Sequence, residues 1–99
     1  MFVVRDVLHC RPGKVRPMIE KFRIMARVIK EMGNESPRVL TDASGEQFWT
    51  VVIEVEVANI ADFFAMEQSV MANAAAREAM ADYHELVDTG QRQIYRIEG

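Results

Sequence analysis

Two short segments of the chain carry the side chains that could act chemically on a small molecule. Arg5 and His9 are four residues apart in a strand-like run, so they share one face of that strand. In a second strand-like run, Thr50 and Glu54 have the same spacing and Phe48 extends their face. An imidazole can transfer a proton near neutral pH, and a guanidinium can hold an anionic group. We therefore take His9 as the candidate catalytic acid or base. The candidate ligand-binding residues are Arg5, Phe48, Thr50 and Glu54.

A structural interpretation of the same residues competes with this site. Arg5 could instead neutralise Glu54 or Glu56 across a sheet, since an unpaired buried charge is strongly destabilising. A cavity with space beside His9 would favour a ligand site. Side chains packed solidly around it would favour the structural interpretation.

The sequence holds few other reactive groupings. Cys10 is the single cysteine, so an internal disulfide and a multi-cysteine zinc site are excluded. We expect its thiol to be buried as a small apolar group. His84 is predicted to lie on a solvated helix surface, and no pair of histidines has metal-ligand spacing. We therefore expect no metal and no cofactor.

Composition limits the class of protein. The 99 residues carry a net charge of −3, and 49% of them are hydrophobic. This length predicts a single domain over residues 1–99. Nucleic-acid-binding modules usually have a strong basic surplus, so a nucleic-acid partner is not expected. No window approaches 18 uncharged apolar residues and the N-terminus is unlike a signal peptide, which favours a cytoplasmic protein with no membrane partner.

The stretch Gln47–Val57 organises the predicted fold. Most of its residues are β-branched or aromatic, which suits a strand. Its first face is apolar throughout, and we expect it to lie beneath helices with Trp49 in the core: Trp49, Val51, Ile53, Val55 and Val57. The second face is too apolar for open water and too charged for a plain core: Phe48, Thr50, Val52, Glu54 and Glu56.

The remaining elements follow from periodicity and capping residues. Further strands are predicted over Phe2–Cys10, Glu35–Thr41 and Gln91–Ile97. Apolar residues at steps of three and four predict a helix over Lys14–Met32, which Gly33 closes. A second helical region, Ile60–Val87, begins after a capping Asn59 and breaks near Asn73. Asp88, Thr89 and Gly90 are expected to end this helical part.

The resulting order, β-α-β-β-α-β, predicts an α+β, ferredoxin-like fold. Its antiparallel sheet has the first and third strands at the centre and helices on one face. The other face would leave an apolar patch that monomers seldom tolerate. Two copies paired face to face about a two-fold axis would cover both patches, so we expect a homodimer.

With this order over essentially all 99 residues, the chain resembles the dimeric α/β-barrel superfamily. The first strand running into Arg11-Pro12-Gly13-Lys14 and an amphipathic helix is similar to NIPSNAP-like and antibiotic-monooxygenase-like members. The segment Ala74–Leu86 resembles the short extra helix of that group. The resemblance implies two ferredoxin-like subunits that close their sheets into a shared barrel. Haem-degrading members carry an Asn on the first strand and a Trp on the second long helix, and this chain has neither.

The resemblance implies a range of functions, because the superfamily includes cofactor-free monooxygenases and isomerases. We expect a small homodimer with an inter-sheet or sheet–helix cavity that holds a small, partly apolar organic molecule. It would act as a cofactor-independent monooxygenase or isomerase. The alternative is a non-catalytic oligomerisation or ligand-sensing module, which a filled interior without a ligand-sized cavity would favour.

Overall fold

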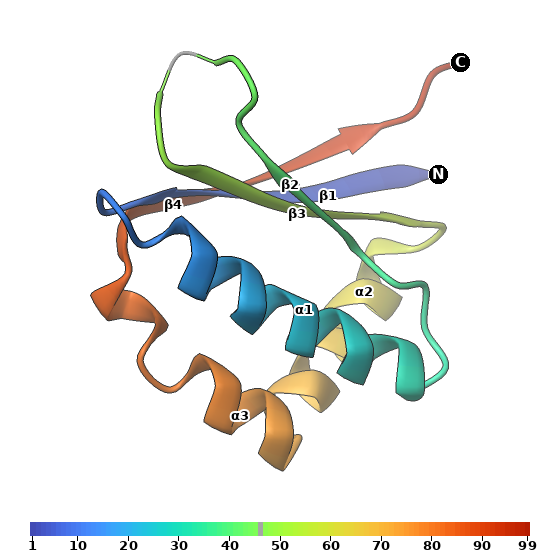
Figure 1. Cartoon of the computed structure of the whole chain (residues 1–99). Helices are drawn as coiled ribbons and strands as arrows, with labels where there is room; N and C mark the ends of the chain where they lie inside the picture. The colour runs from blue at the N-terminus through green and yellow to red at the C-terminus, as the bar shows by residue number, and fades with distance from the viewer. Residues whose placement is uncertain (46) are drawn as a thin grey trace.

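Four strands form one antiparallel sheet, and all the helices lie on one side of it (Figure 1). The computed structural model describes residues 1–45 and 47–99. The strands are β1 (Phe2–Cys10), β2 (Arg38–Thr41), β3 (Thr50–Val57) and β4 (Val87–Arg96), in the sheet order β2-β3-β1-β4. The first and third strands are therefore central, which confirms the predicted ferredoxin-like α+β fold.

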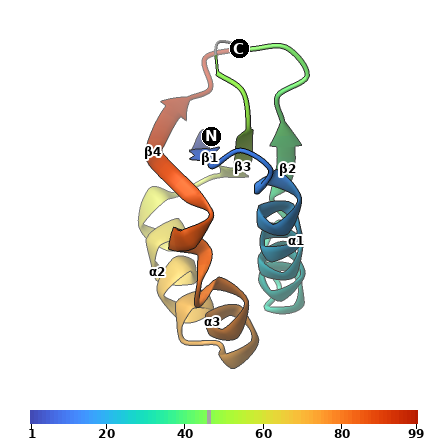
Figure 2. The same cartoon turned by 60° about the vertical axis from the view of Figure 1, so that its left-hand side comes forward.

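Two groups of helices cover the sheet side by side (Figure 2). One is α1 (Val15–Glu31); the other is formed by α2 (Ile60–Met71) and α3 (Ala74–Met80), followed by a short 3₁₀ turn η1 (Tyr83–Glu85). The predicted break is confirmed, since the Asn73 side chain accepts a hydrogen bond from the backbone N–H of Ala76 and starts a new helix. Among the residues described, none of these helices is long and apolar enough to cross a membrane.

The core lies between the sheet and the helices. β1 and β3 contribute Val4, Cys10, Val51 and Val55, and the helices contribute Met18, Phe22, Val28, Ile29, Phe63, Val70 and Ala76. Cys10 is only 4% exposed, as predicted. Burial, with a smaller effect from the Asp88 carboxylate, raises the pKa of its thiol and keeps it protonated.

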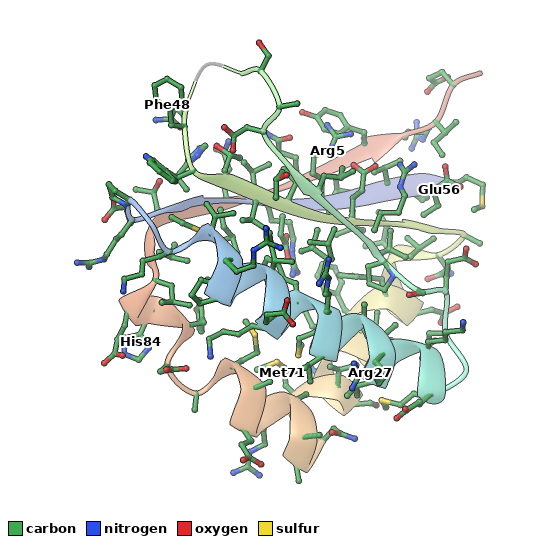
Figure 3. The ribbon with its side chains drawn as sticks, viewed as in Figure 1. Arg5, Arg27, Phe48, Glu56, Met71 and His84 are labelled. Carbon is green, nitrogen blue, oxygen red and sulfur yellow. The ribbon has the colours of Figure 1, made fainter. Side chains whose placement is uncertain are left out.

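The pairing of β1 with β3 decides which side chains share the face without helices. Arg5 lies opposite Glu54, Val7 opposite Val52, and His9 opposite Thr50. Residues directly opposite in an antiparallel pair point to the same side. Figure 3 shows Arg5 on the side of the sheet away from the helices. We call this side of the sheet, centred on these three pairs, the open face.

The start of β3 differs from the prediction. The strand begins at Thr50 rather than Gln47, and Trp49 has a φ of 64°, outside the extended region. The alternation of faces therefore stops at Trp49, whose side chain is 44% exposed. The expectation that Trp49 fills the core was wrong for this reason. Phe48 lies on the same loop and is 82% exposed.

The start of β4 also differs. Asp88, Thr89 and Gly90 do not end a helical segment but belong to β4, which begins at Val87. Gly90 lies opposite Leu8, and a Cβ at Gly90 would come within 2.5 Å of a methyl group of Leu8. This glycine therefore marks a close approach between two strands rather than the end of a helix.

Candidate functional site

The sequence-predicted polar residues come together in a row across three strands of the open face. Arg5 on β1 and Arg38 on β2 lie on either side of Glu54 in register. The Arg5 Nε donates to Glu54 Oε2 at 2.8 Å, and the Arg38 guanidinium donates to Oε1. The Arg5 guanidinium also lies over the Tyr95 ring, 5.6 Å from its centroid. Both oxygens of the carboxylate are thus satisfied by neighbouring strands.

Glu54 is the charged residue that the sheet buries most deeply, at 5% exposure. The hydrogen bond from Arg5 lowers the pKa of Glu54; burial opposes this effect, and Arg38 adds to it. The carboxylate is therefore ionised near neutral pH and fully paired. This agrees with the structural interpretation of Arg5, which predicted neutralisation of Glu54 or Glu56 across the sheet.

His9 forms a second polar pair at the other end of the open face. Its Nδ1 lies 3.1 Å from the Thr50 hydroxyl oxygen, and that hydroxyl donates its proton to the Gln47 carbonyl at 3.1 Å. A hydroxyl has a single proton, so both contacts are hydrogen bonds when Nδ1–H of His9 is the donor to Thr50. In this tautomer of the neutral ring, Nε2 carries no proton and is the acceptor nitrogen. A general base needs such an unprotonated nitrogen.

The predicted site residues are therefore divided. Arg5, His9, Thr50 and Glu54 share the open face, whereas Phe48 projects from the loop that precedes β3 (Figure 3). A small pocket of about 230 Å³ opens beside Glu54, with Val3, Glu35, Ser36, Arg38, Val55 and Glu56 as its other walls. His9 does not line this pocket.

The larger cavity lies on the opposite side of the sheet, between the strands and the helices. Its volume is about 550 Å³, within the range of small-molecule sites. Apolar side chains from β1, β3 and the three helices make up most of its wall, among them Val4, Leu8, Phe22, Met25, Ile29, Ile53, Phe63, Met66, Val70 and Met80. Of the predicted site residues, only Glu54 is among the lining residues, and its carboxylate is held by Arg5 and Arg38 on the open face.

One ionic cluster gives this cavity a polar end. Arg92 on β4 donates from Nε and Nη2 to the two oxygens of Asp6, at 2.7 and 3.0 Å, and from Nη1 to Glu67 on α2 at 3.1 Å. A further bond joins its Nη2 to the second oxygen of Glu67. The guanidinium also lies 5.2 Å from the centre of the Phe63 ring. The hydrogen bonds that Arg92 donates to these carboxylates, Asp6 first, raise the pKa of Arg92 above its already high value.

Sequence reasoning missed this cluster, although one signal was present. Asp6 falls among the apolar, helix-facing positions of β1, where a carboxylate needs a cation. β4 supplies it, because Arg92 lies directly opposite Asp6 in register. Within residues 1–45 and 47–99, no group of three or more His, Cys, Asp or Glu side chains could hold a metal ion.

Comparison with known proteins gives structural matches only. No model of a protein family matches the chain, and no curated protein is similar to it. Among solved structures, a NIPSNAP family protein of unknown function from Agrobacterium tumefaciens superposes with a TM-score of 0.83 at 12% identity, covering 98% of this chain and 87% of that one. An uncharacterised NIPSNAP domain protein from Burkholderia xenovorans gives 0.80 at 14% identity, with 100% and 96% covered.

A crystal structure of an antibiotic biosynthesis monooxygenase also matches, with a TM-score of 0.67 at 10% identity over the full length of both chains. Identities this low carry the fold and leave the activity open. The chain has the same fold as these NIPSNAP and antibiotic-monooxygenase structures.

Proposed function

We propose that the protein is a cytoplasmic homodimer that binds a small, partly apolar organic molecule between its sheet and helices. We further propose that it oxygenates or isomerises that molecule without a cofactor. The observation that supports binding best is the cavity of about 550 Å³ with its mainly apolar wall.

Oxygenation without a cofactor restricts the substrate, because the substrate itself must supply the electrons that reduce O2. An activated CH2 group meets this need: CH2 and O2 become C=O and H2O, with one oxygen atom in the product and one in water. Such a reaction begins with loss of a proton from carbon. A carbon acid such as anthrone is therefore a suitable test compound, with O2 uptake as the readout.

Binding is tested with the fluorescent apolar probe N-phenyl-1-naphthylamine. Met25→Trp fills part of the cavity from α1, and Arg27→Trp adds the same side chain to an exposed position of the same helix. We expect wild type and R27W to bind the probe alike and M25W to bind it at least tenfold more weakly. Equal binding by all three proteins would place the probe outside the cavity and contradict the proposal.

The site residues predicted from sequence form a second part of the proposal. If two copies pair through the open face, His9 and Arg5 come to line the space between the sheets. This space lies on the other side of the sheet from the sheet–helix cavity, so it is a separate candidate place for the reaction. A substrate bound between the two sheets would give its proton to the Nε2 of His9, and Arg5 would hold an anionic group. We expect His9→Ala to leave the melting temperature within about 2 °C of wild type while abolishing anthrone-dependent O2 uptake. If the His9→Ala variant keeps its anthrone-dependent O2 uptake, His9 is not the catalytic base.

The alternative is a non-catalytic ligand-sensing or oligomerisation module, which shares the binding step. It is favoured by the polar groups of the cavity, since Asp6, Glu67 and Arg92 are all engaged with one another. Probe binding without turnover of carbon acids would select this alternative over the enzyme.

A further inference from the structure

The cluster of Asp6, Glu67 and Arg92 at the rim of the sheet–helix cavity has more free hydrogen-bond acceptors than free donors. Arg92 has five N–H groups, and four of them already point to Asp6 and Glu67. One N–H remains, on Nη1. Each of the four carboxylate oxygens accepts one bond from Arg92 and keeps about one further acceptor position. About four free acceptor positions therefore stand against one free donor.

The charge of the lining residues also favours a hydrogen-bond donor or a cation over an anion. Among the described residues that line the cavity, three are acidic (Asp6, Glu54 and Glu67) and one, Arg92, is basic. Glu54 is paired with Arg5 and Arg38 on the open face, across the sheet from the cavity. The charged groups of the cluster at the cavity rim are Asp6, Glu67 and Arg92, which together carry one net negative charge. A ligand carboxylate would need a bidentate cation, and Arg92 cannot provide a second N–H without breaking a bond to Asp6 or Glu67.

We propose that the cavity selects molecules with an apolar body and a terminal hydrogen-bond donor, an amine or hydroxyl group, and discriminates against carboxylates. This inference rests on the proposed function, since it assumes that the cavity holds an organic molecule. The apolar body lies along the wall formed by residues such as Phe22, Met25 and Met66. The donor group meets the free oxygens of Asp6 and Glu67, and an ammonium gains from the net charge as well.

Solvent moderates the expected selectivity. The side chains of Arg92, Asp6 and Glu67 are 32%, 31% and 37% exposed, so the cluster lies at the rim of the cavity rather than in its depth. Partial screening reduces the preference for an amine from that of a fully buried site. A hydrogen bond to a charged group in this setting corresponds to roughly a tenfold change in Kd.

Three matched probes test the inference on the unaltered protein: 2-naphthylmethylamine, 2-naphthylmethanol and 2-naphthoate. Their rings are the same, and they differ in the terminal group. Each is titrated against bound N-phenyl-1-naphthylamine at pH 7, where the amine is protonated. We expect the amine to bind about tenfold more tightly than the carboxylate, with the alcohol between them.

A pair of variants assigns the preference to the cluster. Glu67→Gln keeps the shape of the side chain and removes one charge from the rim, whereas Glu20→Gln removes a charge from an exposed position of α1 outside the cavity lining. We expect E67Q to reduce the amine-to-carboxylate ratio to about threefold or less and E20Q to preserve it. Asp6→Asn should act as E67Q does, so the test survives if one variant fails to fold.

The outcomes separate this inference from the proposed function. If the amine and the carboxylate displace the fluorescent probe equally well, the selectivity is overturned while binding in the cavity stands. If the ratio stays at tenfold in both E67Q and D6N, the cluster is not its source and the inference fails. If N-phenyl-1-naphthylamine does not bind wild type at all, the proposed function fails and the inference with it.

Discussion

Glu54 demonstrates how strand register can stabilise a buried charge on a sheet. β1 and β2 each place an arginine beside it, so that neither carboxylate oxygen is left without a partner. The same register arranges His9 with Thr50 at the other end of the open face. Paired polar side chains on a face that also holds apolar residues are what a buried interface requires.

The pKa shift of Glu54 predicts how stability depends on pH. Its pKa is lowered in the folded protein, so pairing stabilises the fold fully above the unfolded value of about 4.3. That contribution is lost as the pH falls below this value and through the lower folded pKa. We expect Glu54→Gln to cost about 1.5–3 kcal/mol at pH 7 and to weaken the decline in stability between about pH 5 and pH 2.

Urea unfolding of wild type and variant across this pH range measures both effects. Glu20→Gln is the matched control, because Glu20 pairs with Arg23 at an exposed position of α1. Its pH dependence should follow that of wild type. An E54Q curve parallel to wild type from pH 5 to pH 2 would contradict the prediction.

Single residues also mark the limits of sequence reasoning. The spacing of Arg5, His9, Thr50 and Glu54 was sufficient to place them on one sheet face, because alternation within a strand is strictly periodic. The Asp6–Arg92–Glu67 cluster was not predicted, since it joins three elements whose relative register the sequence does not state. Asp6 on an apolar strand face was a usable sign that a cation had to lie nearby.

At the scale of elements, the sequence predicts the helices more accurately than it predicts the ends of the strands. The amphipathic period of α1, the positive φ of Gly33 and the caps at Asn59 and Asn73 are all encoded within a few residues. The start of β3 and the start of β4 depend instead on partners far along the chain. Trp49 has a positive φ, and its carbonyl accepts a hydrogen bond from the Cys10 N–H at the end of β1. Gly90 pairs with Leu8 of β1.

The break between α2 and α3 offers a test of this local coding. The Asn73 side chain accepts a hydrogen bond from the Ala76 N–H at 3.1 Å and starts α3, which packs against α1. Replacing Asn73 with Ala removes this cap and should cost about 1 kcal/mol. For a chain of this length, the melting temperature should fall by roughly 4–8 °C.

The control for the cap is Asn73→Asp, since Asp caps helices as well as Asn does. Its melting temperature, measured by circular dichroism, should stay within about 2 °C of wild type. If N73A and N73D melt alike, the side-chain bond to Ala76 contributes nothing to the stability of α3.

At the scale of the whole molecule, the sheet has two faces that need different cover. One lies beneath its own helices, with the cavity between them. The other presents exposed or half-buried apolar side chains from all four strands: Val3, Val7, Leu40, Val52 and Tyr95. The loop holding Phe48 and the C-terminal segment both rise on this side of the sheet (Figure 1). A second copy of the chain is the partner that the proposed homodimer places there.

Val52 is the position from which this assembly can be tested. It lies on the open face between Val7 on β1 and Leu40 on β2, so its surroundings across the sheet are apolar. In an isolated subunit, Val52→Glu would expose its carboxylate to water at little cost. In a dimer the same carboxylate would be buried next to Glu54, which already occupies Arg5 and Arg38. The cost of about 3–5 kcal/mol raises the dimer Kd more than a hundredfold.

Light scattering coupled to gel filtration at micromolar concentration measures the molar mass of each protein and so its oligomeric state. We expect wild type to elute as a dimer and V52E as a monomer with its circular dichroism unchanged. Gln68→Glu introduces the same charge on the exposed side of α2 and should remain dimeric. If V52E is a dimer, the dimer interface does not include the open face. A monomeric wild type would leave the open face in solvent, and the space between two sheets, with its proposed role for His9, would not exist.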